Sequence, residues 1–582
     1  MLANLSHMNF VISASQPGRF FSFLRGFFKP TRLAWVMLAA SGWIATVCNL
    51  ALWRELQQLQ LLQTPDGYAF AVALAGTMAA TMLLLLCLVA WRPVFKPTLA
   101  LLLLLAAGGA HFMLGYGVVI DATMVINVLH TDLRESSALL GWRLVTTVLL
   151  LGVLPAIGLW RQPLVFAPWP RQLLKNAVGA LGAFLLLLAL VAVSFQPLAA
   201  NMRNHKQLRY LMNPLNTVYA LGYLASQPLR RDEFGTEPVG LDAHATPFQP
   251  TGTASTVASK PPLLLLVLGE TGRSGNFGIN GYARPTTPQL DAVHTATPDK
   301  LLSFGNAWSC GTSTATSVPC MFSHLGKEKF ESRSRNYEGL LDVLQRAGLA
   351  VLWLENQSGC KGVCDRVPTI DTRTLPNPTL CPEGECFDSI MLEGLDARIA
   401  ALPAERRARG VVLVLHQMGS HGPAYYHRSP PEFKRFLPEC GTIDLQKCSR
   451  AEVVNAYDNS IVYTDHFLAS SIAWLQQPRQ QAAYASAMLY VSDHGESLGE
   501  NNIYLHGMPY FIAPDVQKHV PWVAWFSAQY QQAAGLGMAC LQGRINERLT
   551  HDHYFHTVLG LLQVQTALYQ PALDALAPCR TE

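Results

Sequence analysis

The chain has 582 residues, of which 50% are hydrophobic and only 14% are charged, and its net charge is +4. A soluble enzyme carries roughly 25% charged residues, so part of this chain must contact lipid. Only five of the 39 acidic residues lie among the first 200 residues, which indicates that one domain contacts lipid and the other lies in water. The small net charge and the absence of a Lys/Arg run argue against nucleic acid as a partner.

The first 200 residues contain five apolar stretches, each close to the roughly 20 residues that a membrane span requires. Buried core helices are the alternative, but five such stretches in series favour membrane spans. The first stretch is too long for a cleavable signal peptide and lacks a small-residue cleavage site. We therefore predict a transmembrane domain over residues 1–200, with spans at about 33–53, 68–91, 98–120, 144–160 and 176–196.

Basic residues set the orientation of these spans, because short cytoplasmic segments are enriched in Lys and Arg. They cluster before the first span, between the second and third, and between the fourth and fifth: Arg19, Arg25, Lys29, Arg32, Arg92, Lys96, Arg161, Arg171 and Lys175. Five spans with a cytoplasmic N-terminus place everything after Gln196 outside the inner membrane, in the periplasm of a Gram-negative-like cell. The loop Asp121–Arg143 falls on the same outer side.

The cysteines fit this topology. Two lie in spans, and the other ten all follow Gln196, eight of them in close sequential couples: Cys310, Cys320, Cys360, Cys364, Cys381, Cys386, Cys440, Cys448, Cys540 and Cys579. Cys360 and Cys364 also have a spacing found in zinc ribbons, which is the rival interpretation. A periplasmic location favours disulfides over thiolate metal sites.

Residues 201–260 are expected to connect the two halves. Asn201–Ser226 is polar and aromatic, and it is typical of an amphipathic helix at a membrane surface. Asp232–Lys260 is rich in Thr, Pro, Ala and Gly, and we interpret it as a linker.

Residues 261–582 alternate short apolar runs with helical patterns. The runs 262–270, 348–355, 410–416 and 487–493 suit strands buried on both faces of a parallel sheet. Helical patterns cover 337–347, 388–400 and 452–476, so the fold class is an α/β/α sandwich. Ligand sites in such sheets form at the carboxyl ends of strands. Three of these ends carry polar side chains: Glu270, then His416 with His421, and Asp493 with His494.

Three sets of residues in this domain are candidates for metal binding or catalysis. Glu270, Asp493 and His494 offer the oxygen and nitrogen ligands that suit Zn²⁺. Each alone is more often a helix cap or a surface turn, but the run SDHGESLGE is much more specific. The hydroxyl-rich segment Ser309–Ser323 places Thr residues where a helix N-terminus and a metal ion can activate a hydroxyl. An ordinary capped Ser/Thr loop is the alternative. Cationic groups that can stabilise a phosphoryl group form the third set: Lys361, His416, His421 and His506.

Together these segments resemble the phosphoethanolamine transferases of Gram-negative envelopes, members of the alkaline phosphatase/sulfatase-like superfamily, and most closely the lipid A-modifying type linked to polymyxin (colistin) resistance. The resemblance covers nearly the whole chain. It includes the five spans, DATMVINVLHTD, NHKQLRYLMNP, GETGRSGNFGINGY, SCGTSTATSVPCMFS, HQMGSHGP, NAYDNS, SDHGESLGENNIYLHGMP and FHTVLGLL.

This resemblance implies roles for individual residues. Thr314 is similar to the nucleophile that carries phosphoethanolamine, and Glu270, Thr314, Asp493 and His494 match the zinc ligands. Lys361, His416, His421 and His506 match the groups that hold substrate phosphate, and some members bind a second zinc at such histidines. The family pattern also pairs Cys310–Cys320, Cys360–Cys364, Cys381–Cys386 and Cys440–Cys448, which leaves Cys540–Cys579 by elimination.

The reaction implied is a double displacement. Thr314 takes phosphoethanolamine from phosphatidylethanolamine, and the phosphate of lipid A (or of lipopolysaccharide) then accepts it, at the surface of the lipid membrane. Three alternative hypotheses remain. The first is the same chemistry on core oligosaccharide or periplasmic glucan, and the second is a superfamily hydrolase such as a phosphodiesterase. The third is a membrane-anchored sensor that forms no covalent intermediate. A sulfatase would carry Cys/Ser-x-Pro-x-Arg, which is absent around Thr314.

Overall fold

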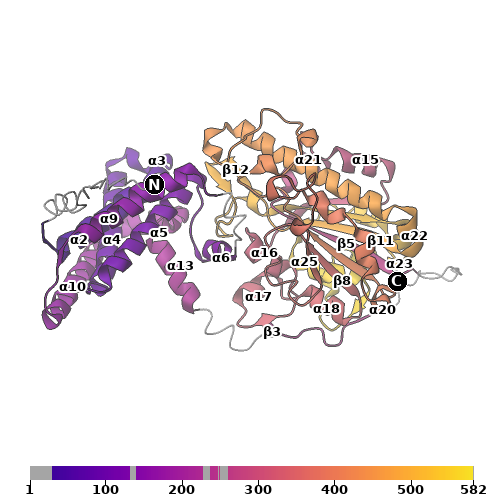
Figure 1. Cartoon of the computed structure of the whole chain (residues 1–582), viewed down its shortest axis with the longest axis horizontal. Coiled ribbons are helices and arrows are strands. Elements are labelled where there is room, and N and C mark those ends of the chain that lie inside the picture. Colours follow the sequence, from indigo (N-terminus) through magenta and orange to yellow (C-terminus); the bar gives the residue numbers. More distant parts are fainter. Residues whose placement is uncertain (1–28, 131–138, 227–235, 247, 249–259, 581–582) are drawn as a thin grey trace, which may run out of the picture. The chain divides into compact units, whose positions relative to one another are not determined.

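The computed structural model describes residues 29–130, 139–226, 236–246, 248 and 260–580 (Figure 1). Arg19, Arg25, the middle of the predicted outer loop and much of the predicted linker lie outside the described residues. Two compact units are present: residues 1–108 with 146–201, and residues 109–145 with 202–582. The second unit thus includes the segment between the third and fourth predicted spans.

Within the described residues, five helical stretches are long and apolar enough to cross a membrane. They are Leu33–Gln58, Pro65–Leu88, Phe95–Tyr116, Trp142–Arg161 and Trp169–Val193. The first comprises α2 (Leu33–Thr46), a 3₁₀ turn and α3 (Leu50–Gln58), and the second to fifth are α4, α5, α8–α9 and α10. Their bounds differ from the sequence ranges by a few residues. For example, α10 begins at Trp169, because Pro170 suits the first turn of a helix.

The fourth stretch shows how lipid-embedded backbone is satisfied. Pro155 has no N–H for the carbonyl of Leu151, and the helix widens into a π-turn over Leu149–Val153. The indole of Trp43 donates to Leu151 O at 3.4 Å, which gives that carbonyl a partner. Because an unpaired carbonyl is costly in lipid, this contact compensates for the proline.

The second unit is built on one eight-stranded sheet of order β15-β6-β14-β11-β5-β10-β8-β9. Strands β11, β5, β10, β8 and β9 run parallel, whereas β14 is antiparallel to both its neighbours. The strand bounds are Leu549–Thr550 (β15), Leu301–Trp308 (β6), His519–Phe526 (β14), Ala485–Ser492 (β11), Pro262–Gly269 (β5), Val411–His416 (β10), Ala350–Glu355 (β8) and Thr369–Asp371 (β9). The four predicted strands are β5, β8, β10 and β11 of the parallel centre, whereas β6, β14 and the short strands β9 and β15 were not predicted.

Helices cover both faces of this sheet, as Figure 1 shows, which confirms the sandwich fold. Along β5, Leu264, Leu266 and Leu268 enter one core, and the alternating residues enter the other. The first core packs on α16 (Thr314–Met321), α18 (Leu340–Arg346) and α25 (Asp552–Leu561); the second packs on α15 (Pro288–Ala296) and α21 (Arg450–Leu475). The helix predicted at 388–400 is instead a 3₁₀ turn, Asp388–Leu392, and α19, Leu395–Ala400, because Gly394 between them is left-handed (φ 67°).

The connector differs from its prediction. Asn201–Ser226 is not one helix: α11 (Phe195–Asn204), α12 (Gln207–Tyr210) and α13 (Leu215–Ser226) follow one another. Pro214 disfavours helix at the residue before it, so the chain breaks there. Part of the predicted linker is packed against the domain, since β3 (Thr236–Glu237) pairs with β7 (Asn336–Tyr337) and β4 (His244–Ala245) pairs with β16 (Val564–Gln565).

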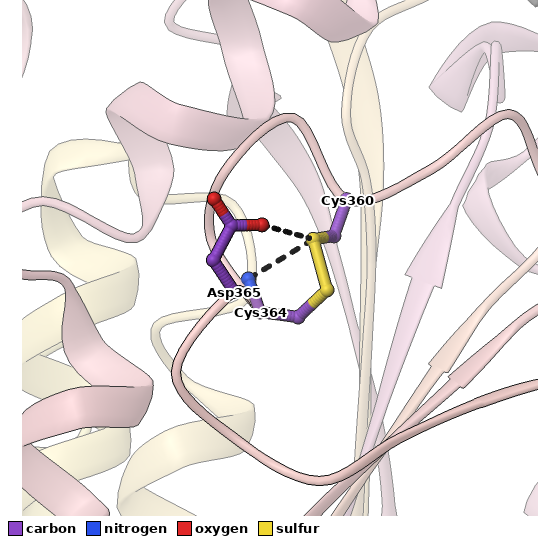
Figure 2. A group of neighbouring side chains, drawn as sticks. All are labelled: Cys360, Cys364 and Asp365. Carbon is purple, nitrogen blue, oxygen red and sulfur yellow. Dashed lines mark hydrogen bonds between the residues drawn. A yellow bond between two sulfur atoms is a disulfide. The ribbon is translucent and has the colours of Figure 1, made fainter.

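Five disulfides join the ten cysteines that follow Gln196, in the pairs named above: Cys310–Cys320, Cys360–Cys364, Cys381–Cys386, Cys440–Cys448 and Cys540–Cys579. Figure 2 shows the Cys360–Cys364 bond beside Asp365. Because both sulfurs are consumed in that bond, these residues offer no thiolate for a zinc ribbon.

Candidate metal-binding active site

The proposed metal ligands leave the sheet on neighbouring strands. Gly269, the last residue of β5, pairs in register with Ser492, the last residue of β11. Glu270 and Asp493 are therefore adjacent, and His494 follows directly. His416 ends β10 on the other side of β5, paired with Leu268. The parallel register thus gathers residues that are more than 200 positions apart in the sequence.

These side chains form one buried cluster. The ligand atoms of Glu270, Asp493 and His494 lie within 4.8 Å of one another. His494 Nε2 is 3.3 Å from Glu270 Oε1 and 3.3 Å from Asp493 Oδ2. The Thr314 hydroxyl donates to Glu270 Oε2 at 3.1 Å, and its oxygen lies 3.5 Å from His494 Nε2. All four residues of the predicted ligand set are therefore together.

Thr314 is the first residue of α16, with Ser313 at the N-cap position. The Ser317 hydroxyl donates to Asp493 O at 2.5 Å, which fastens this helix to the exit of β11. The Cys310–Cys320 disulfide joins the segment before this helix to the last turn of the helix. A helix N-terminus favours negative charge, so an alkoxide or phosphate at Thr314 is stabilised there.

The cluster fits a divalent metal ion. Asp493 Oδ2 is buried and accepts no hydrogen bond from the described residues, whereas Oδ1 accepts from the N–H groups of Thr271 (3.1 Å) and His494 (2.7 Å). His494 Nδ1 contacts Gly495 O at 2.8 Å, which leaves Nε2 facing the carboxylates. Two carboxylates, an imidazole and a hydroxyl are a donor set that Zn²⁺ accepts.

The electrostatics of the site agree with this. Burial, and then the charge of Glu270, raise the pKa of Asp493 to about 7. Burial opposes the charged form of His494, but the Asp493 charge and the hydrogen bond to Glu270 raise its pKa to about 10. The buried carboxylate pair therefore calls for positive charge, which a proton or a metal ion can supply.

Three further histidines lie near this cluster. The ring of His506 is 4.3 Å from that of His494 and 5.3 Å from that of His421, measured between centroids. His506 Nδ1 lies 3.0 Å from Glu496 Oε2, and His416 Nδ1 lies 3.1 Å from Glu355 Oε2. His416 Nε2 is buried and has no hydrogen-bond partner among the described residues.

The loop between His416 and His421 is held by a buried carboxylate. Asp388 accepts from the N–H groups of Met418 at 2.8 Å and Gly419 at 3.0 Å. Gly419 is left-handed (φ 53°) and lies so close to Glu270 that a Cβ atom there would be 2.6 Å from Glu270 O. The backbone of this loop therefore packs directly against the backbone of Glu270, a proposed metal ligand.

Lys361, the fourth predicted phosphate-binding residue, lies in the loop closed by Cys360–Cys364. Its ammonium donates to Ser358 O at 3.1 Å and to Ser358 Oγ at 2.9 Å. In this structure Lys361 is thus tied to its own loop, whereas the histidines surround the cluster.

Sequence reasoning missed three carboxylates that orient the site: Glu355, Asp388 and Glu496. Glu355 ends a predicted strand and Glu496 lies inside SDHGESLGE, so both positions carried a signal. Asp388 carried none, because its role depends on a loop that meets it only in the fold.

Comparison with known proteins gives two family matches. The family described as "Phosphoethanolamine transferase EptA/EptB" matches residues 78–229, and the family described as "Sulfatase" matches residues 262–564.

Individual relatives cover nearly the whole chain. Phosphoethanolamine transferase EptA of Salmonella typhimurium is 38% identical over 558 residues, which are 94% of this chain and 97% of the relative. Phosphatidylethanolamine transferase Mcr-1 of Escherichia coli is 38% identical over 538 residues, covering 91% and 94%. The solved structure of the integral membrane protein lipooligosaccharide phosphoethanolamine transferase A from Neisseria meningitidis matches with a TM-score of 0.86 at 34% identity, and covers 94% of this chain and 99% of that one.

Proposed function

The chain belongs to the phosphoethanolamine transferases of the EptA/Mcr type, and on that premise we propose that it carries phosphoethanolamine from phosphatidylethanolamine to a phosphate of lipid A through a covalent adduct on Thr314 at a zinc site. It is a multi-pass protein of the bacterial inner membrane, with its catalytic domain in the periplasm. The observation that carries the proposal is the Thr314 hydroxyl, 3.1 Å from Glu270 and 3.5 Å from His494 at a helix N-terminus.

Glu270, Thr314, Asp493 and His494 are the residues that would hold the zinc ion. When bound, zinc supplies the Lewis acidity that lowers the pKa of a hydroxyl and neutralises charge on a phosphoryl group. The chain itself supplies position. Ser317 fixes α16 against β11, so the Thr314 oxygen is held in a single place beside the cluster.

In the first displacement, Thr314 Oγ attacks the phosphorus of phosphatidylethanolamine. The bond from phosphorus to the glycerol oxygen breaks, diacylglycerol leaves, and its oxygen takes up the proton that Thr314 gives up. His416, His421 and His506 would hold the phosphoryl oxygens, which carry the charge in the transition state. Glu355 and Glu496 support this role, because they contact the Nδ1 atoms of His416 and His506, so that the Nε2 atom of each ring would be the one that binds substrate.

In the second displacement, a phosphate oxygen of lipid A attacks the phosphorus of the Thr314 adduct. The bond to Thr314 Oγ breaks, and Thr314 regains a proton as the acceptor phosphate gives one up. The same residues serve both steps, since each passes through a similarly charged phosphoryl group. Both donor and acceptor are lipids, which accounts for the membrane-spanning half of the chain.

The modification should lower the sensitivity of the cell to polymyxin. Phosphoethanolamine adds an ammonium group beside a phosphate, so cationic peptides lose Coulomb attraction to the surface. Polymyxin susceptibility of cells that express the chain, measured against cells that express Thr314→Ala, tests this consequence. Unchanged sensitivity despite modified lipid A would refute the link to resistance and leave the transferase assignment standing.

Expression in a lipid A-producing host that lacks such enzymes tests the proposal. Mass spectrometry should find phosphoethanolamine on lipid A with the wild-type chain and none with Thr314→Ala. Phosphoethanolamine on core sugars or glucans, with lipid A unmodified, would replace the proposed acceptor. Release of free phosphoethanolamine without any acceptor would make the chain a hydrolase.

A further inference from the structure

We infer that the segment from Tyr116 to Met124, which follows helix α5, positions His506 and acts through the hairpin β12–β13. Strand β12 spans Ser497–Glu500, β13 spans Ile503–Leu505, and His506 is the next residue. All of these residues belong to the second compact unit. The inference rests on the proposed role of His506 in binding substrate phosphate.

The hairpin that carries His506 holds an unusual backbone. Asn501 and Asn502 are left-handed, with φ of 53° and 59°, which suits a tight hairpin turn. Leu505, immediately before His506, is also left-handed, with φ of 62°. A branched apolar residue rarely adopts this conformation, and it persists only where the surrounding structure enforces it. The position of His506 therefore depends on what packs against the hairpin.

The backbone at Gly117 packs against the turn. A Cβ atom at Gly117 would lie 2.7 Å from Asn502 O and 3.2 Å from Ile503 Cα, and Gly117 itself is left-handed (φ 68°). Only glycine fits this close approach without displacing backbone atoms on one side or the other. The segment after α5 thus limits where the tip of the hairpin can lie.

A second contact lies on the other side of His506. Gly507 is left-handed (φ 87°), and a Cβ atom there would lie 2.7 Å from Met124 Cε. The Gly507 N–H donates to Thr312 O at 2.7 Å, two residues before Thr314. The Met124 methyl group therefore packs close to Gly507, beside the hydrogen bond that joins the residue after His506 to the loop before Thr314.

The segment is itself firmly anchored. Tyr116 and Val118 are each 4% exposed and share a hydrophobic core with Leu498 and Tyr504 of the hairpin. Next to them, the Tyr116 hydroxyl donates to Ile443 O at 3.4 Å. Because these contacts fix the segment, it can hold the hairpin, and with it His506 3.0 Å from Glu496.

Replacing Gly117 by alanine tests the inference. The new methyl group should push the turn away and shift His506, and a misplacement of about 1 Å costs roughly a hundred-fold in rate. We expect Gly117→Ala to lower turnover about ten- to a hundred-fold with zinc content unchanged. Met124→Ala adds no atoms and should lower turnover by about two- to ten-fold. Gly281→Ala is the matched control, since Gly281 is also left-handed (φ 92°) but a Cβ atom there would meet nothing within 4 Å, and it should keep wild-type turnover.

The assay uses the full-length chain, reconstituted with vesicles that contain phosphatidylethanolamine and lipid A. Melting temperature and zinc per protein are recorded for each variant, so that global unfolding is recognised. Wild-type turnover in both Gly117→Ala and Met124→Ala would overturn the inference. If Gly117→Ala fails to fold, Met124→Ala decides alone.

A double-mutant cycle separates positioning from general damage. If Gly117 acts through His506, Gly117→Ala should lower turnover less than about two-fold in a His506→Ala background. Losses that multiply in the double variant would overturn the inference and leave the proposed function intact. If His506→Ala alone has no effect, it is the proposed role of His506 that fails.

Discussion

Adding one methyl group at Gly419 should weaken metal binding without altering any proposed ligand. The Cβ atom of Gly419→Ala would lie 2.6 Å from Glu270 O and 3.0 Å from Glu270 N, against an ordinary contact distance of 3.4 Å or more. Either the loop or Glu270 must move by most of an ångström. Glu270 is the more consequential of the two, because its carboxylate is a proposed zinc ligand.

The magnitude follows from two terms. Alanine in a left-handed conformation costs about 1–2 kcal/mol of stability wherever it occurs. Displacing the support of a metal ligand typically costs 10- to 100-fold in metal affinity. We therefore expect a modest loss of stability, a zinc affinity lower by about 10- to 100-fold, and a comparable loss of turnover at limiting zinc.

Zinc affinity is measured by competition with a chelator, beside melting temperatures with and without zinc. Gly281→Ala is the matched control, because Gly281 is also left-handed (φ 92°) but a Cβ atom there would meet nothing within 4 Å. It should lose stability and keep zinc affinity. Equal zinc affinities in the two variants would refute the reasoning, since the close approach to Glu270 would then have no effect on the site.

Other consequences are equally direct. Thr314→Ala should fold but lose transfer by roughly a thousand-fold or more, because the nucleophile is gone, whereas Thr314→Ser should keep part of the activity. Mass spectrometry of lipid A checks both variants, and full modification of lipid A by the alanine variant would contradict the assignment. Glu270→Ala and Asp493→Ala should lose zinc and turnover together, whereas His506→Ala should keep zinc and lose turnover; equal zinc loss in all three would make His506 a ligand. A fragment of residues 236–582 should fold only in an oxidising compartment, because its disulfides need one. It should cleave a small soluble phosphoethanolamine ester only slowly and act poorly on vesicles, and full activity on vesicles would contradict a role for the segment around Gly117.

The sequence located the centre of the site because its signals are local. Glu270, His416 and Asp493 each follow a short apolar run, and a parallel sheet brings the ends of such runs together. The same logic cannot find β6 and β14, since Leu301–Trp308 and His519–Phe526 are interrupted by polar and small residues and pair antiparallel, outside the parallel centre of the sheet.

The partners of the histidines were beyond sequence reasoning for a different reason. Whether Glu496 meets His506 depends on a hairpin whose turn uses left-handed asparagines, and no residue pattern specifies that pairing. Likewise, the contact of Gly117 with Asn502 joins positions almost 400 residues apart. Such approaches are properties of the packed fold rather than of a motif.

The central claim is that phosphoethanolamine passes through Thr314. The most direct test is the intact mass of the purified full-length chain after incubation with phosphatidylethanolamine in the absence of acceptor, followed by peptide mapping. The account predicts one added phosphoethanolamine group, located on Thr314, that disappears when lipid A is supplied and never forms on Thr314→Ala. An unmodified chain that still transfers phosphoethanolamine to lipid A, or an adduct on any other residue, would contradict it.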